Sequence, residues 1–399
     1  MRVTNDFFPW FPPEEYERRH AVVREAIRAR GLAALLIHGT RTYIGTDGGH
    51  PNVAWVAATC AFFSSYVVFP LDGEPTFVGF GPWHIGNNRA MSVLREFRPG
   101  GKDPVPAIVG RLQEVGAARG RLGLVGSLAA LEPESLPLEH YERLRKALPE
   151  VEFEDATQWY EDLRLVKSPP EVEALRKAAA ITDRAQQALL DAARPGVTPA
   201  RLATVALTTV HAAGGRSPYT HIGATPMAAP TRSYPDPYPV AHPLERGDVL
   251  LTETVAGYSG YFGKLHTTTF LGEPPSAYRE IFALAAGVYG ELLTSVRPGQ
   301  TVREVLALAR RFDGAGLTMG IPVLEGWSTY QTRPYTGWPR PASEVDLGFE
   351  LRPGHAVTLV AHPVTPDRRR GVWVGGLCLV TETGVEPLHR FAPQDLRVL

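Results

Sequence analysis

Hydrophobic positions in the first part of the chain alternate between helix-like and strand-like spacing. Residues 12–32, PPEEYERRHAVVREAIRARGL, begin with prolines and acids and end at Arg-Gly, the polarity expected of a helix. The run AALLIHG predicts a short buried strand, and residues 60–70 and 75–80 predict a β-hairpin across LDGE. Helix-like and strand-like runs then alternate as far as residue 155. An α/β domain is therefore expected over residues 1–158.

From residue 159 onward the helices become longer and the strands come in pairs. Ser168, followed by two prolines and a glutamate, predicts a helix start, and Pro195-Gly196 predicts its end. Residues 216–248 contain many prolines and are expected to form a long loop, a kind of segment that is usually functional or disordered. A second domain is expected over residues 159–399. Its further helices are expected from residue 198 and over residues 276–296 and 301–313.

The segment GDVLLTETVAGYSGYFGKLHTTTF, residues 247–270, has the pattern of a β-hairpin. Two strand-like runs flank a Gly/Tyr turn, with Glu253 in the first run and Lys264 and His266 in the second. Because side chains alternate along a strand, Lys264 and His266 are expected on one face. Three titratable groups are therefore expected close together.

Composition narrows the class of protein. The 399 residues are 44% hydrophobic and 21% charged, typical of a globular protein of two domains. The net charge of −1 favours neither nucleic acid nor a membrane surface. Cys60 and Cys378 are far apart, which favours a reducing compartment. The first residues show no signal-peptide pattern, and no apolar run has the roughly 18 residues that span a bilayer, so a cytoplasmic location is expected.

Five segments of the chain follow one another in a distinctive order: LRLVKSPPEVEALRKAAAIT, RGDVLLTETVAGYSGYFGKLHTTTF, GLTMGIPVLE, LRPGHAVTLVAHP and GVWVGGLCLVTETG. In this order they resemble the pita-bread family of creatinase, prolidase, aminopeptidase P and methionine aminopeptidase. The resemblance covers nearly the whole chain. It implies an N-terminal α/β domain followed by an α+β pita-bread domain, and a homodimer that acts on a small molecule.

The metal ligands of this family do not carry over. Metal-dependent members hold two divalent cations with two aspartates, a histidine and two glutamates, ligands that suit such ions. By resemblance only Glu253 remains a carboxylate, and Lys264 would repel a cation. We therefore expect no metal and no other cofactor, and we expect Lys264 to supply the positive charge that the metals supply elsewhere in the family. In the alternative interpretation, the Lys264 side chain reaches solvent and Glu253 is an ordinary strand residue. The ligand positions fall on Glu253, Lys264, Leu317, Val360 (or His362 if the strand bulges) and Gly375.

Creatinase is the natural comparison, because it has this fold without metals and hydrolyses a C–N bond. Its substrate-gripping glutamate falls on His266, and its catalytic histidine falls within residues 232–236, which contain no histidine. Creatine is therefore not the expected substrate.

Histidine is the side chain best suited to proton transfer near neutral pH. A lysine two residues away lowers the pKa of His266 and favours its neutral form, which can act as a base. An alternative for each histidine is a purely structural strand or loop position. The expected catalytic residues are His266, Lys264, Glu253 and His362. The expected substrate-binding residues are Arg232, Tyr234, His221, His242, Glu325, Trp327, Tyr330 and Arg333, with Tyr335, Trp338, Asp47 and His50 as further candidates.

Three functions fit the sequence. The first is a metal-independent hydrolase or lyase that acts on a C–N or related bond of a small polar molecule. The second is a catalytically inactive pita-bread binding module, and the third is a metal-dependent Xaa-Pro peptidase whose ligands lie in another register.

Overall fold

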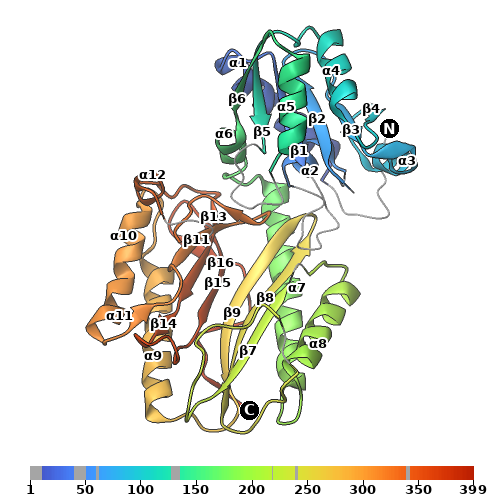
Figure 1. Cartoon of the computed structure of the whole chain (residues 1–399). Coiled ribbons are helices and arrows are strands. Elements are labelled where there is room, and N and C mark those ends of the chain that lie inside the picture. The colour runs from blue at the N-terminus through green and yellow to red at the C-terminus, as the bar shows by residue number, and fades with distance from the viewer. Residues whose placement is uncertain are drawn as a thin grey trace. The chain divides into compact units, whose positions relative to one another are not determined.

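The computed structural model describes residues 11–39, 51–59, 63–126, 135–217, 219–238, 241–337 and 342–399 (Figure 1). The chain divides into two compact units, Met1–Arg164 and Leu165–Leu399. This division falls six residues after the expected one. The reason is helix α6 (Thr157–Asp162), whose Tyr160 is buried in the core of the N-terminal unit.

The N-terminal unit is an α/β sandwich around one six-stranded sheet, with strand order β4-β3-β2-β1-β5-β6. The expected hairpin of β2 and β3 is confirmed. Alternate residues of β1 enter two cores, Leu35 and Ile37 on one face and Ala34 and Leu36 on the other. The strands are β1 (Ala34–Gly39), β2 (Ser65–Pro70), β3 (Thr76–Gly79), β4 (Glu96–Pro99), β5 (Gly120–Val125) and β6 (Val151–Asp155); the other helices are α1 (Pro13–Ala29), α2 (Pro51–Ala57), α3 (Gly81–Met91), α4 (Val105–Glu114) and α5 (Leu138–Ala147).

The C-terminal unit is built on a mixed sheet with strand order β12-β11-β13-β15-β9-β8-β7, to which β16 and β17 are added. Figure 1 shows α7 and α8 beside β7, β8 and β9, and α9 beside β13 and β15, in agreement with their contacts. The strands are β7 (Thr220–Pro226), β8 (Asp248–Tyr258), β9 (Tyr261–Phe270), β11 (Leu324–Trp327), β12 (Gln331–Thr332), β13 (Ala356–Ala361), β15 (Val374–Val380), β16 (Val385–Pro387) and β17 (Arg397–Val398), with β10 (Thr318–Met319) paired to β14 (Pro363–Val364); the helices are α7 (Pro169–Ala192), α8 (Pro199–Ala212), α9 (Ser276–Ser295), α10 (Val302–Leu306), α11 (Arg310–Gly314) and α12 (Glu344–Leu347).

Helix α7 begins where its sequence predicts. Ser168 precedes it, and the Glu171 carboxylate accepts a hydrogen bond from the Ser168 backbone N–H at 2.7 Å. This contact satisfies one of the backbone donors that a helix start leaves unpaired. The single helix expected over residues 301–313 is wrong, because a 3₁₀ turn, Ala307–Ala309, separates α10 from α11.

The long loop expected over residues 216–248 is also partly wrong, because it contains β7. This strand pairs with β8 over its whole length, from Thr220 opposite Thr254 to Pro226 opposite Asp248. It lies at the end of the strand order, and an edge strand tolerates prolines that a central strand excludes. The prolines around residues 226–243 are therefore the reason that the sequence predicted a loop in place of this strand.

Both faces of the β8–β9 hairpin are covered. Leu250 and Ala256 of β8 belong to the core formed with α7 and α8. Glu253 lies at an odd-numbered position of β8 and therefore points to the opposite face, where the candidate residues meet. No helix of the described residues has the length and apolar character needed to cross a membrane.

Candidate active site

Lys264 is the centre of a buried charge cluster on the hairpin. Its Nζ lies 3.1 Å from Glu253 Oε1 and 3.1 Å from Glu325 Oε2. All three side chains are buried, and the ammonium also lies 4.2 Å from the ring centre of Trp327. The ion pair expected between Lys264 and Glu253 is confirmed, and Glu325 completes it. The alternative in which Lys264 reaches solvent is wrong.

The surroundings keep Glu253 and Lys264 ionised. Burial raises the pKa of Glu253, but the Lys264 ammonium and the imidazoles of His221 and His266 outweigh burial and bring that pKa well below its usual value. Burial likewise lowers the pKa of Lys264, but the carboxylates of Glu253 and Glu325 raise it above its usual value. Each charge therefore depends on the other.

Strand register aligns the cluster across five neighbouring strands. Glu253 lies opposite His221 on β7 and opposite His266 on β9, and His266 lies opposite Gly375 on β15. Gly375 in turn pairs with Val360 on β13, and this ladder runs without a bulge from Ala356 to Ala361. The unbulged register therefore puts Val360, and not His362, in the row.

Two groups from the β7 segment also contact Glu253. Tyr219 donates its hydroxyl to Oε1 at 2.9 Å, while His221 Nδ1 lies 3.3 Å from Oε2. The rings of Tyr219 and His221 stack with centres 4.4 Å apart. Burial and the adjacent carboxylate raise the pKa of Tyr219 well above its usual value, so the phenol keeps the proton that it donates.

The environment of His266 suits a proton acceptor. It is fully buried, and neither ring nitrogen has a hydrogen-bond partner among the described residues. Nε2 lies 3.8 Å from Glu253 Oε1, too far for a hydrogen bond but close enough for attraction, and the ring stacks on Trp373 at 4.4 Å. Burial lowers the pKa of His266, and Lys264 adds to this effect against the attraction of Glu253. The neutral imidazole can therefore accept a proton.

His362 has a different environment. Its Nε2 donates to the carbonyl of Ser233 at 2.7 Å, which leaves Nδ1 as the ring atom without a proton. Nδ1 lies against Gly320, where a Cβ would approach within 2.4 Å. Burial lowers the pKa of His362 to about 4. The ring also lies 5.1 Å from Trp373, so His362 supports the site and fixes the segment around Ser233.

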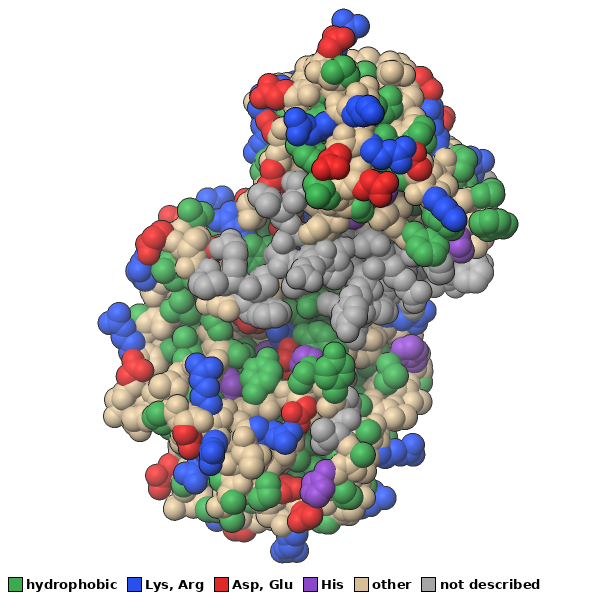
Figure 2. All heavy atoms as spheres, viewed as in Figure 1, with side chains coloured by type: hydrophobic (Ala, Val, Ile, Leu, Met, Phe, Trp, Pro, Cys, Tyr) green, Lys and Arg blue, Asp and Glu red, His purple; other side chains and the backbone are tan. Residues whose placement is uncertain are grey.

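The remaining expected binding residues separate into two groups. Tyr234 lies 4.7 Å from Trp373, and Tyr330 lies 5.3 Å from Trp327, so both belong to the aromatic surroundings of the cluster. Tyr234 is 43% exposed, and the cluster therefore extends toward the surface. On the face drawn in Figure 2, histidine side chains lie among hydrophobic ones in the middle of the C-terminal unit.

Three of the expected binding residues contact groups outside the charge cluster. Arg232 forms an ion pair with Asp236, four residues along the chain. Arg333 lies 3.8 Å from Asp346 and over the ring of Phe349. His242 has a side chain that is 77% exposed and lies 3.7 Å from Glu245. Tyr335 is buried. Asp47, His50 and Trp338 lie outside the described residues.

Sequence reasoning missed Tyr219 and Trp373. Trp373 precedes Gly375 by two residues, so strand alternation places both on one face, and that spacing was a usable signal. Tyr219 stands two residues before His221 by the same rule, but the prolines nearby concealed the strand.

The metals of the family do not fit these residues. The Lys264 ammonium lies between the two carboxylates, where a bound cation would meet its charge. At Gly375 a Cβ would approach the carbonyl oxygen of Leu359 within 2.4 Å, which leaves no room for a ligating side chain. Among the described residues, no group of three His, Cys, Asp or Glu is placed to hold a metal.

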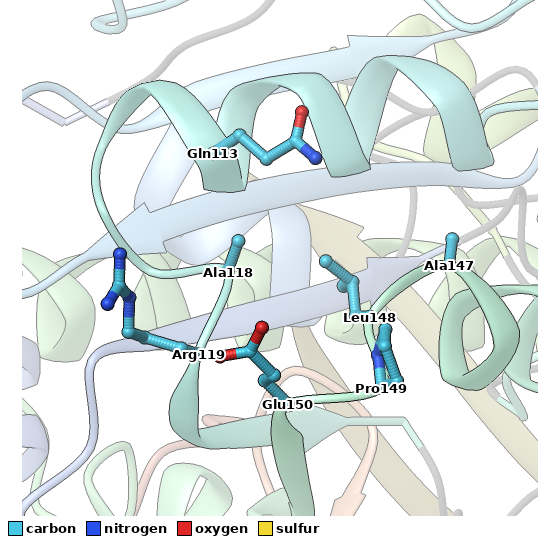
Figure 3. Close-up of a pocket in the computed structure, with 7 residues that line it drawn as sticks. All are labelled: Gln113, Ala118, Arg119, Ala147, Leu148, Pro149 and Glu150. Atoms are coloured by element: carbon cyan, nitrogen blue, oxygen red, sulfur yellow. The ribbon is translucent and has the colours of Figure 1, made fainter.

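The N-terminal unit has a surface hollow of about 280 Å³ near the ends of α4 and α5. Figure 3 shows its lining residues, which include none of the expected site residues. The hollow is lined by Gln113, Ala118, Arg119, Ala147, Leu148, Pro149 and Glu150.

Several curated proteins are similar to this chain. An uncharacterized hydrolase/peptidase of Sinorhizobium fredii is 29% identical over 273 residues, 64% of this chain and 65% of that protein. A creatinase of a Bacillus species is 25% identical over 70% of this chain and 69% of its own length. The ectoine hydrolase of Halomonas elongata is 24% identical over 96% of this chain and 97% of its own length.

Solved structures share the fold. The prolidase from Pyrococcus horikoshii superimposes with a TM-score of 0.76 at 19% identity, over 94% of this chain and 98% of that one. Residues 19–166 match the creatinase/prolidase N-terminal domain, and residues 173–387 match metallopeptidase family M24. The chain is therefore a member of metallopeptidase family M24, with the creatinase/prolidase N-terminal domain and the pita-bread fold expected from its sequence.

Proposed function

We propose that this protein is a metal-independent hydrolase that cleaves a C–N or related bond of a small polar molecule. One observation carries the proposal. A buried lysine ammonium joins two carboxylates at the family's metal position, beside a neutral histidine whose two ring nitrogens have no hydrogen-bond partner in the part of the chain that the structure describes.

His266 is the proposed general base. In the proposed reaction His266 takes a proton from water as the oxygen attacks the carbon of the scissile bond, and the imidazolium then gives the proton to the leaving nitrogen. Glu253, 3.8 Å from Nε2, favours the positive charge that forms on the ring in between. Tyr219, His221 and Lys264 fix that carboxylate in place.

Lys264 is proposed to replace the charge of the metals without their Lewis-acid chemistry. It holds Glu253 and Glu325 together and offsets their repulsion. A buried carboxylate pair without a cation would cost several kcal/mol, so the lysine is required for the cluster to form.

The comparisons support hydrolysis at the coarser level. Relatives with the printed names creatinase and ectoine hydrolase align over most of this chain. Xaa-Pro dipeptidases are also similar to this chain, so the names support hydrolysis, and the choice of a small polar substrate over a peptide is part of our proposal. By the family resemblance we further propose a homodimer. From the net charge and the hydrophobic pattern of the sequence we propose a cytoplasmic protein that acts on neither nucleic acid nor a membrane.

Elemental analysis of protein purified without chelator tests the metal-independent part. We expect no stoichiometric Mn, Co, Zn or Fe, and activity on a panel of small amides, amidines and ureas that EDTA leaves unchanged. One or two equivalents of metal, with activity lost to EDTA and restored by metal, would establish a peptidase-type site instead. Tight binding of panel compounds without turnover would favour the binding module.

A further inference from the structure

Another histidine, His389, contacts the main chain of Lys264. It lies just after β16, and its Nε2 is 2.9 Å from the Lys264 carbonyl oxygen. Its Nδ1 is 2.7 Å from Oδ1 of Asp183 on α7. The His389 side chain is only 4% exposed. This imidazole therefore links α7, β9 and the C-terminal segment at the lysine of the proposed site.

The hydrogen bonds fix the orientation of this histidine. A carbonyl oxygen only accepts, so Nε2 is the donor to Lys264. The Nδ1 side of the ring faces Asp183 Oδ1, while Asp183 Oδ2 accepts the backbone N–H of Arg390 at 2.7 Å and that of Phe391 at 3.4 Å. Asp183 therefore holds both the His389 ring and the backbone that follows it.

The position of His389 compensates for a break in the sheet. Strands β9 and β15 pair only at His266–Gly375 and Leu265–Gly376, so the ladder stops before Lys264. His389 supplies the donor that the next carbonyl lacks. Gly376 makes room for it, since a Cβ there would lie 3.0 Å from Cδ2 of His389.

We propose that His389, held in place by Asp183, is a positioning residue for Lys264. The Lys264 ammonium meets two carboxylates at 3.1 Å, and a buried ion pair of this kind is favourable only when its geometry is good. A hydrogen bond that fixes the Lys264 carbonyl also fixes the backbone of Lys264, and with it the direction in which the side chain leaves the strand. This inference rests on the role of Lys264 in the proposed function, but its consequence can be measured without a substrate.

Amine reactivity provides that measurement. The sequence contains five lysines, at positions 102, 146, 167, 177 and 264. Lys264 and Lys167 are equally buried, each 7% exposed, whereas the Lys177 side chain is 51% exposed. Reductive methylation of the full chain with formaldehyde, followed by peptide mass spectrometry, reports each lysine separately. In the wild type we expect Lys177 to react and Lys264 and Lys167 to stay protected.

Substitution of His389 should release Lys264 alone. In His389→Leu we expect methylation of Lys264 to rise by about tenfold, the effect of losing one hydrogen bond, while Lys167 stays protected. His389→Gln, which keeps a donor, should restore part of the protection. Asp183→Asn should fall between wild type and His389→Leu, because the imidazole can still donate from Nε2 but loses the carboxylate that orients it. His242→Gln is the matched control, since His242 is exposed.

Two results would overturn the proposal. If Lys264 stays as protected in His389→Leu as in the wild type, His389 does not position it. If Lys167 and Lys264 become reactive together, His389 only stabilises the fold. An enzyme that proves inactive on every compound tested would leave this reactivity pattern intact, so failure of the proposed function is distinguishable from failure of this inference.

Discussion

The two faces of the β8–β9 hairpin are both buried and both carry polar groups beside apolar ones, yet these polar groups differ in chemistry. The face toward α7 carries Thr252, Thr254 and Thr267, which surround the amide of Gln186. Gln186 Nε2 donates to Thr267 at 3.0 Å, and its Oε1 accepts from Thr254 at 2.7 Å and from Thr252 at 3.2 Å. These groups are neutral and satisfy one another.

The opposite face carries Glu253, Lys264 and His266. Here the charges are paired, but no described residue forms a hydrogen bond with either nitrogen of His266. A buried network with all its hydrogen bonds made keeps a fold rigid. A buried polar group without a hydrogen bond costs stability, so its presence calls for an explanation such as a functional role. The difference is consistent with an α7 face that holds the hairpin in place and with the proposed reaction on the opposite face.

The largest expected effect comes from His266→Leu. Loss of the proposed base should lower kcat by roughly 100- to 10,000-fold. The midpoint of thermal unfolding should stay unchanged or rise, because two unpartnered buried nitrogens are removed. Thr267→Val, at the neighbouring position on the other face, should show the reverse pattern of lower stability with unchanged kcat. Equal activity of His266→Leu and wild type would remove His266 from the mechanism.

The next effect comes from Lys264→Met. Two carboxylates would remain without their cation, so the free energy of unfolding should fall by about 3–5 kcal/mol, measured by urea denaturation. Lys264→Arg should not restore activity, because a planar guanidinium cannot take the place of an ammonium. A second substitution, Glu253→Gln, should recover part of the lost stability. An unchanged unfolding free energy in Lys264→Met would contradict the role of this ion pair.

A smaller effect is expected on the site face when the pH falls. The pKa of His362 is about 4 in the folded protein and 6.5 in the unfolded chain, so the unfolded chain binds more protons between these values. Stability is therefore full above pH 6.5 and is lost as the pH falls toward 4. The contribution of His362 to this loss is about 3 kcal/mol. In His362→Gln, urea denaturation at pH 7 and pH 4.5 should show a correspondingly weaker pH dependence; an identical dependence would mean that His362 does not titrate in this way.

The smallest effect is expected on the α7 face. Gln186→Leu removes the partner of buried hydroxyls and should lower the free energy of unfolding by about 1–3 kcal/mol. The site should keep its kcat, because the α7 face contributes no group to the reaction. A fall in kcat without a fall in stability would show that the two faces are not separable in function.

Local sequence determined much of the fold. The capping residues around Ser168, the hairpin pattern of residues 247–270 and the alternation of the N-terminal domain all lie in short stretches whose geometry depends on neighbouring residues. The strand period placed Lys264 and His266 on one face, and the pairing of Lys264 with Glu253 followed from adjacent strands of one hairpin.

Only the tertiary structure decided which other residues join the hairpin. Glu325 comes from β11 and Tyr219 from beside β7, and each reaches the cluster through strand pairing between segments far apart in the chain. The same holds for His389, whose partners Asp183 and Lys264 lie 206 and 125 residues away. Local patterns specify the face on which a side chain lies, but contacts over such separations depend on how the whole sheet is assembled, and that order is not written in any single segment.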